Sequence, residues 1–398
     1  MNTNIQKADF NANVALLTVT RLTVNTSIRM VYPFLAIFAA GMGVEIGAIS
    51  LALAVSMAMS AVGPFLAPIA DRYGRKTGML MGLAIYLIGT LLAGIWPGYA
   101  TFFLSILLGN LGNNVFVPAL QAYLGDHTPY EKRGLYLAIA EIPWALSFIL
   151  LIPLVGLIIE KSIWYAPFWY FSALVVLTMA LIAWRIPNEK PAADETKSLF
   201  SNIKQVLTSA PAMWGMLMGF LIITGNEVVN MVFGVWIQDS YGLQIAALGA
   251  ASAVIGVSEL AGEGITAWLA DRIGKERSVI LGIVLSSAFV LTLPWLGKSI
   301  VGALVWLFMF YFTFELIIVS ALPMMTEVMP QARATVMALF IAALSLGRAA
   351  GDVAAPLLYR GGFWFNAGAC VVLNLLAWLA LSRIRFPKQT KLPDEVVK

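Results

Sequence analysis

Twelve apolar runs, each long enough to cross a lipid bilayer, follow one another along this chain of 398 residues. A membrane-spanning helix needs about 20 mostly apolar residues, because the hydrocarbon core is about 30 Å thick. Each run is expected to be helical, since a helix pairs its own backbone N–H and C=O groups where water cannot. The sequence thus predicts an all-α polytopic membrane protein with twelve transmembrane helices, at residues 14–40, 46–70, 77–96, 99–124, 135–159, 163–184, 212–237, 245–270, 278–297, 300–326, 334–358 and 363–382.

Composition excludes several other classes of protein. Charged residues make up 12% of the chain, against roughly a quarter in soluble proteins. The basic residues are dispersed, so we expect no nucleic-acid partner. One cysteine, Cys370, and one histidine, His127, leave no disulfide framework, no cysteine-based metal site and no Cys/His catalytic pair. No P-loop phosphate motif is present, which argues against an ATP-driven pump. We therefore expect no enzyme, no cofactor and no metal.

The one long polar stretch between apolar runs separates the sixth run from the seventh. It divides the chain into a six-helix bundle at residues 1–184, a cytoplasmic interdomain linker at 185–211 and a second six-helix bundle with a cytoplasmic tail at 212–398.

The distribution of Lys and Arg among the loops predicts the orientation, because cytoplasmic loops carry an excess of both. With both termini inside, nineteen basic residues lie on the cytoplasmic side, and only Lys161, Lys298 and Arg360 lie on the other. We expect a multi-pass protein of the cell (inner or plasma) membrane with both termini in the cytoplasm.

Two loop motifs recur at a spacing of about 200 residues. Residues 71–76 (DRYGRK) follow the second run, and residues 271–277 (DRIGKER) follow the eighth. An acid, a proline and an arginine after the fourth run recur after the tenth, as Asp126, Pro129 and Arg133 and as Glu327, Pro330 and Arg333. Two matches at one spacing indicate two halves of the same design.

These loops resemble those of the major facilitator superfamily (MFS). Residues 70–76 resemble its signature loop between spans two and three, with a weaker copy at 270–277, and residues 125–134 resemble its loop after span four. The resemblance covers residues 14–385 and implies the MFS fold: two pseudo-symmetric six-helix bundles around a central cavity, with transport by alternating access. It also implies a gating or latch role for Asp71, Gly74, Arg75, Arg133, Asp271, Arg272 and Arg333. The alternative is that they only flank hairpins on the positively charged side.

Charged residues inside the predicted spans are costly at bilayer depth and usually face a cavity or a partner. They occur in spans one, five, seven, eight, ten and eleven; spans three, six, nine and twelve, which the resemblance places against lipid, have none. They are Arg21, Arg29, Glu141, Glu227, Glu259, Glu263, Glu315, Arg348 and Asp352. This distribution predicts a central polar path.

Helical phase identifies candidate cavity residues on spans one, four and seven. At about 100° per residue, the polar side chains of span one fall within roughly 80° of one another. Together with span five, the candidates for substrate binding are Asn25, Arg29, Tyr32, Asn110, Asn114, Gln121, Glu141 and Asn230.

Two roles remain open for the charges in these spans. Arg29 either binds an anionic substrate group or pairs with Glu141 or Glu315. Arg348 and Asp352, four residues apart, are predicted to pair on one helix face. The candidates for proton coupling, each of which could instead form a structural hydrogen bond, are Glu227, Glu259 and Glu315.

We expect a secondary transporter, similar to the drug/proton antiporter branch, that exports small, partly apolar or cationic solutes. The proton gradient would supply the energy, and the partners would be a small-molecule substrate and the lipid bilayer, with the chain acting as a monomer. The first alternative is a carrier for an organic anion, sugar or lipid-like amphiphile with Arg29 as the headgroup ligand. A remote alternative is a non-transporting membrane sensor.

Overall fold

The computed structural model describes residues 3–63, 73–129, 132–188 and 203–384, with the side chains of 3–9, Ala267 and Asp271 left undescribed. Within these ranges the regular structure is helical and contains no strand. The helices are α1 (Thr3–Arg29), α2 (Leu35–Met42), α3 (Ile46–Ser60), α6 (Arg75–Ile95), α7 (Tyr99–His127), α8 (Arg133–Glu141), α9 (Pro143–Leu146), the π-helix η2 (Ser147–Leu151), α10 (Ile152–Lys161), α11 (Ala166–Arg185), α13 (Ile203–Leu207), α14 (Ala210–Asn230), α15 (Phe233–Tyr241), α16 (Ile245–Ile273), α17 (Lys275–Leu296), α18 (Ile300–Val328), the 3₁₀-helix η3 (Pro330–Ala332), α19 (Arg333–Tyr359) and α20 (Phe363–Leu381).

Ten of the described helices are long and apolar enough to span a membrane, or up to eleven if α2 and α3, bent by 111°, count as one span. The difference from the predicted twelve lies in the first two spans. The helix α1 is not among the ten. It carries the buried Arg21 and Arg29, and it can be this polar because other helices of the protein, rather than lipid, surround these side chains. The second predicted span, 46–70, extends beyond residue 63 and out of the described part. The all-α polytopic fold is confirmed.

Backbone geometry repeats between the two halves as the loop motifs do. Each half begins with an interrupted helix, α1 and α2 in the first and α14 and α15 in the second. Gly43 and Gly242 follow these pairs with φ of 66° and 63°, and Gly74 and Gly274 precede α6 and α17 with φ of 88° and 92°. Positive φ is a conformation that glycine adopts without steric cost, so the loops that connect the repeated spans fold alike.

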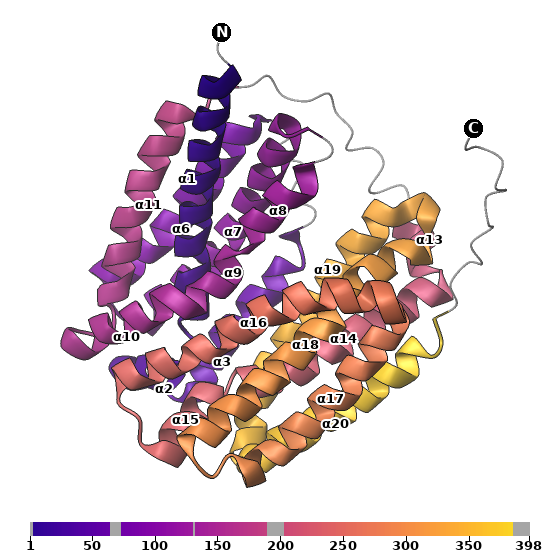
Figure 1. The fold of residues 1–398 in the computed structure, drawn as a ribbon. Helices are drawn as coiled ribbons and strands as arrows, with labels where there is room; N and C mark the ends of the chain where they lie inside the picture. Colours follow the sequence, from indigo (N-terminus) through magenta and orange to yellow (C-terminus); the bar gives the residue numbers. More distant parts are fainter. Residues whose placement is uncertain (1–2, 64–72, 130–131, 189–202, 385–398) are drawn as a thin grey trace, which may run out of the picture.

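The two halves touch at one end of the molecule. We call the end with the start of α1 and α13 the terminal end (top of Figure 1) and the end with α2, α10 and α15 the far end. There α3 packs against α19, and α10 packs against α16. Helix α16 approaches α9 so closely that a Cβ on Gly256 would lie 2.4 Å from the carbonyl oxygen of Ala145.

Polar contacts between the halves also lie at the far end. Glu45 and Arg360, both exposed, form an ion pair of 3.8 Å, and Glu160 accepts a hydrogen bond from the backbone N–H of Ala246 at 2.6 Å. At the terminal end, no ion pair joins the halves among the described residues. Residues 189–202 of the predicted linker at 185–211 lie outside the described ranges, so the division into domains stays a prediction.

Candidate functional site

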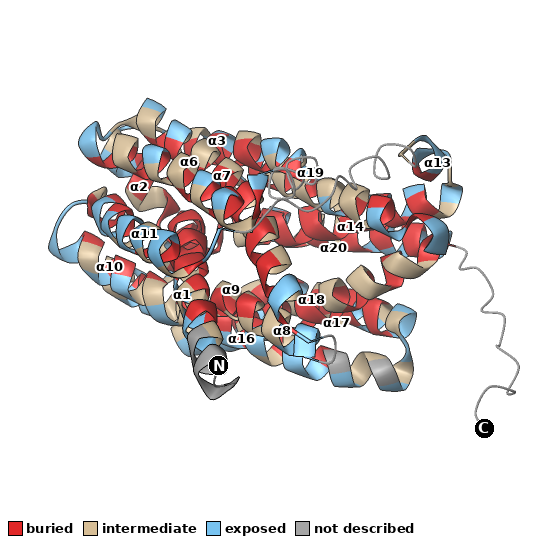
Figure 2. Ribbon diagram, turned by 90° about the horizontal axis from the view of Figure 1, so that it is seen from above, coloured by how far each residue is buried: buried red, intermediate tan, exposed pale blue. Residues whose placement is uncertain are grey.

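A cavity of about 480 Å³ lies between the halves, bounded by α1, α3, α7, α8, α9, α14, α16, α18 and α19. Towards the far end, Phe148 of the first half packs edge-on against Phe233 of the second, and both rings are buried. Ser345, which is partly exposed, and Ile341, which is exposed, lie on the cavity wall in the part of α19 nearer the terminal end. Seen from that end, the helices that meet in the interior of the molecule carry many buried residues, drawn in red (Figure 2). Ionisable residues converge here: Arg29, Glu141, Glu227, Glu259, Glu263, Glu315 and Arg348.

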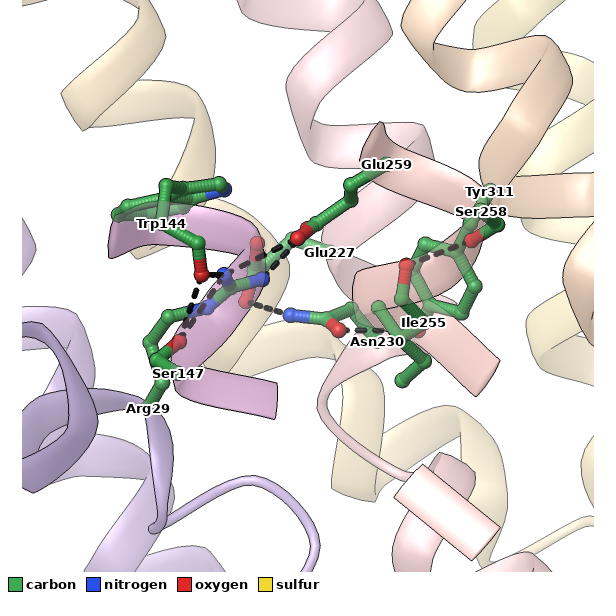
Figure 3. A network of polar contacts seen from close by, with 9 residues as sticks. All are labelled: Arg29, Trp144, Ser147, Glu227, Asn230, Ile255, Ser258, Glu259 and Tyr311. Carbon is green, nitrogen blue, oxygen red and sulfur yellow. Dashed lines mark hydrogen bonds and ion pairs between the residues drawn. The ribbon is translucent and has the colours of Figure 1, made fainter. Parts of the chain in front are cut away.

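Arg29 connects the two halves at the floor of this cavity (Figure 3). Its guanidinium donates two hydrogen bonds to the Glu259 carboxylate, at 3.1 and 2.5 Å, and one to the carbonyl oxygen of Trp144 at 2.5 Å. The rings of Trp144 and Phe148 lie 4.1 and 4.2 Å from its central carbon. Both partners of the ion pair are 6% exposed. This arrangement resembles a structural crosslink more than an open anion site.

Glu141, one of the two acids considered as partners of Arg29, pairs with another arginine. Arg21 binds Glu141 through two hydrogen bonds of 2.9 and 2.5 Å, and Gln121 donates to the same carboxylate at 2.9 Å. Of the two roles left open for Arg29, the pairing with Glu141 or Glu315 is therefore wrong, since its partner is Glu259. Helical phase places a side chain on a face, but the helix opposite determines its partner.

A second polar group lies on the wall formed by the second half. Asn230 donates to Glu227 at 3.1 Å and accepts a hydrogen bond from the Tyr311 hydroxyl at 2.9 Å (Figure 3). Glu227 is 1% exposed, and Asp352 behind it is 0% exposed. The predicted pair of Arg348 and Asp352 is not formed, since no ion pair between described residues includes either side chain.

Two further acids lie where α16 meets α18. Glu315 packs directly on α16, since a Cβ on Gly262 would lie 2.5 Å from the Glu315 Cβ. Glu263 follows that glycine on the cavity wall, one turn beyond Glu259. Of the three carboxylates in this cluster, only Glu259 forms an ion pair with a described residue.

The other candidate cavity residues are placed largely as expected. Asn25, Tyr32, Asn110 and Asn114 line the cavity, whereas Gln121 reaches it only through Glu141. The side-chain amide nitrogen of Asn110 donates hydrogen bonds to the Ser56 hydroxyl and to the backbone oxygen of Ile106, one turn earlier in the same helix. Buried polar atoms without a hydrogen-bond partner in the described protein can accept a solute or water. On the cavity wall they are Asn25 Nδ2, Tyr32 OH, Asn113 Oδ1, Asn114 Nδ2 and Asn226 Nδ2.

The loop motifs form corresponding ion pairs in the two halves. Arg75 binds Asp126 at 2.9 Å, and Lys275, 200 positions later, binds Glu327. Each pair joins the loop after the second span of its half to the end of the fourth, so it stays within one half. Both basic residues begin a helix directly after a glycine, Gly74 or Gly274.

Among the described residues, the contacts of the remaining predicted latch residues lie within one half. Arg133 donates to the carbonyl oxygen of Thr128 at 3.3 Å, Arg272 lies 4.1 Å above the Trp268 ring, and Arg333 is exposed. Asp71 and the side chain of Asp271 lie outside the described part. The latch role stays a prediction.

A second cavity, of about 630 Å³, lies at the far end between α2, α3, α15 and α19. Its wall is mostly aliphatic, with the ion pair of Glu45 and Arg360 at its edge. Binding sites combine an apolar wall with a few convergent polar groups, so the smaller central cavity is the stronger candidate.

Comparison with known proteins agrees with this architecture. An uncharacterized MFS-type transporter of Bacillus subtilis (strain 168), YceJ, is 28% identical over 313 residues, covering 78% of this chain and 80% of that protein. The multidrug resistance protein MdtG of Enterobacter lignolyticus (strain SCF1) is 28% identical over 275 residues, 65% of this chain and 64% of that protein.

Among solved structures, a mutant of the nucleoside transporter NupG superposes with a TM-score of 0.76 at 15% identity, covering 92% of this chain and 98% of that one. At that identity the likeness concerns the fold alone. The sequence model of the Major Facilitator Superfamily matches residues 17–351 and, a second time, residues 215–397. Helical spans, duplicated loops and a polar cavity between two halves thus agree with the sequence match, and the chain belongs to the major facilitator superfamily of transporters.

Proposed function

We propose that this transporter exports small, partly apolar or cationic solutes and that proton movement drives the export. The observation that carries the proposal is an excess of unpaired acid in the cavity. Glu227, Glu263 and Glu315 line the cavity and form no ion pair with a described residue. Arg348 is the cavity-lining arginine that likewise forms no ion pair with a described residue. Three carboxyls against one guanidinium favour a cation, and carboxyls can also take up and release protons.

The apolar part of the wall supports a solute with hydrophobic groups. Aliphatic and aromatic side chains alternate with the acids and amides, a mixture typical of small-molecule sites. They include Ile28, Met57, Trp144, Phe314, Ile318 and Leu322. The similarity to MdtG, a multidrug resistance protein, is consistent with such cargo.

The alternative of an organic-anion carrier that uses Arg29 has less support. Glu259 and the Trp144 carbonyl occupy the Arg29 guanidinium on two sides, and two aromatic rings cover its faces. An anion would first have to displace Glu259. Such an exchange gains little free energy, because the displaced Glu259 carboxylate would then be a buried charge without a partner.

We further propose that the termini lie in the cytoplasm, following the excess of basic residues on that side. The described conformation is then inward-facing, because the halves touch at the far end. The chain would act as a monomer in the inner or plasma membrane, with the proton gradient as energy source.

The proposal is tested with purified protein in liposomes that carry an imposed pH gradient, with tetraphenylphosphonium as the probe cation. We expect uphill movement of the probe when the gradient is present, and loss of that movement in Glu227→Gln and in Glu315→Gln. The control is Glu276→Gln, an exposed acid in the first turn of α17 that does not line the cavity. Probe movement that ignores the pH gradient would contradict proton coupling, and absence of movement would contradict cationic cargo.

A further inference from the structure

The carboxyl group of Asp352 occupies an unusual position in α19. The residue is 0% exposed, and neither of its carboxylate oxygens has a hydrogen-bond partner in the described protein. An isolated ionised carboxylate in such a place would cost many kcal/mol, so a buried carboxyl of this kind must be paired or neutral. No described ion pair supplies the counter-charge.

Another carboxyl lies beside it. Glu227 is the acid whose charge acts most on Asp352, and α14 and α19 are in direct contact there, since a Cβ on Gly351 would lie 2.5 Å from the Glu227 Cβ. Two ionised carboxylates repel each other and offer no donor, whereas a pair that shares one proton has both a donor and an acceptor.

We propose that Asp352 and Glu227 together form the proton-binding site of this transporter and that the pair shares a proton in the described conformation. The inference rests on the proposed proton coupling and assigns the ion to a site separate from the Glu263 and Glu315 end of the cavity. Asp352 does not line the cavity, while Glu227 does. Glu227 thus connects the hidden carboxyl to the solute space.

The groups that face the pair fit a proton better than a metal ion. From the segment between α1 and α2, the buried Tyr32 lies close enough to Glu227 for the two groups to interact electrostatically. From α14, Asn230 donates to Glu227, and through it the Tyr311 hydroxyl of α18 joins the network. On α19 itself, Arg348 lies one turn away and acts on Asp352 as a positive charge. A nearby guanidinium opposes a cation but stabilises the carboxylate that remains after a proton leaves.

The position of Asp352 at the contact between the halves suggests how the site changes access. The Ser50 hydroxyl of α3, in the first half, donates to the backbone oxygen of Asp352 at 2.6 Å. Separation of the halves at the far end would break this contact and uncover Asp352 on that side. A proton held by the pair would then exchange with water at the far end, and its return would accompany closure.

Infrared spectroscopy of the protein in lipid tests directly whether the pair holds a proton. We expect the wild type to show a C=O stretching band of a buried carboxylic acid that Asp352→Asn removes and that Glu227→Gln shifts. The variant Asp352→Glu keeps a carboxyl and should keep a band, which separates loss of the proton from loss of the fold. An identical band in the wild type and in Asp352→Asn would overturn the inference.

Transport then separates this inference from the proposed function. With tetraphenylphosphonium in liposomes, Asp352→Asn should lose movement driven by the pH gradient but keep exchange of labelled for unlabelled probe, because the probe contacts remain. If the wild type responds to the pH gradient and Asp352→Asn responds equally, the proton site is wrong while the proposed function stands. If the wild type does not respond at all, the proposed function itself fails.

Discussion

Arg29 and Glu259, each 6% exposed, form a buried ion pair between the two halves. Two charges removed from water depend on each other, because either one alone would be a buried charge without compensation. The intact pair adds little net stability to this conformation, but removal of one partner would leave a buried charge without compensation, which is strongly destabilising.

We predict that Glu259→Gln destabilises the protein by about 3–5 kcal/mol, the usual cost of removing one partner of a buried pair. The double variant Arg29→Gln/Glu259→Gln should lose less than either single variant, since it leaves no orphan charge. Thermal unfolding in detergent measures both. The matched control is Glu45→Gln at the exposed far-end pair with Arg360, where a change of about 0–1 kcal/mol is expected. Equal effects at the two pairs would contradict the structural role of Arg29.

At the scale of elements, the closure of the far end depends on how closely α16 approaches the fifth span. That span is interrupted at Ile142, directly before Pro143, and continues through the π-helix η2. Gly256 lets the backbones touch, because no Cβ separates it from the Ala145 carbonyl oxygen.

We predict that Gly256→Val moves the population towards conformations open at the far end. The added carbon would lie 2.4 Å from the Ala145 oxygen, and overpacking of this kind typically costs about 1–3 kcal/mol. Spin labels at Lys161 and Lys298, both exposed, should report a longer distance in the variant. Gly264→Val, on the same helix with nothing within 4 Å of its added carbon, should leave the distance unchanged, and a shift there as well would reject the steric explanation.

For the whole molecule, the distribution of contacts implies one conformation of an alternating-access cycle. The halves are joined by contacts at the far end and at the cavity floor, while the ion pairs near the terminal end, Arg75–Asp126 and Lys275–Glu327, remain within one half each. A cavity arranged in this way is reached from the terminal end.

We predict that Ser345→Cys, on the cavity wall, reacts with a membrane-impermeant maleimide added on the cytoplasmic side and not from the other side. Ser50→Cys, which is 1% exposed at the contact between the halves, should not react from either side. The native Cys370 is 1% exposed and serves as the internal blank. Reaction of Ser345→Cys from the opposite side would reverse either the orientation or the facing state.

The sequence by itself determined the helical spans, the duplication at about 200 residues and the concentration of charge along a central path, because each follows from local composition and spacing. It did not determine partners. Arg29 pairs with Glu259, 230 positions away, and Asp352 lies against Glu227 rather than Arg348. Such contacts depend on the rotation and tilt of helices packed against each other across the two halves. Helical phase places a side chain on a face, and only the tertiary structure decides which helix that face meets.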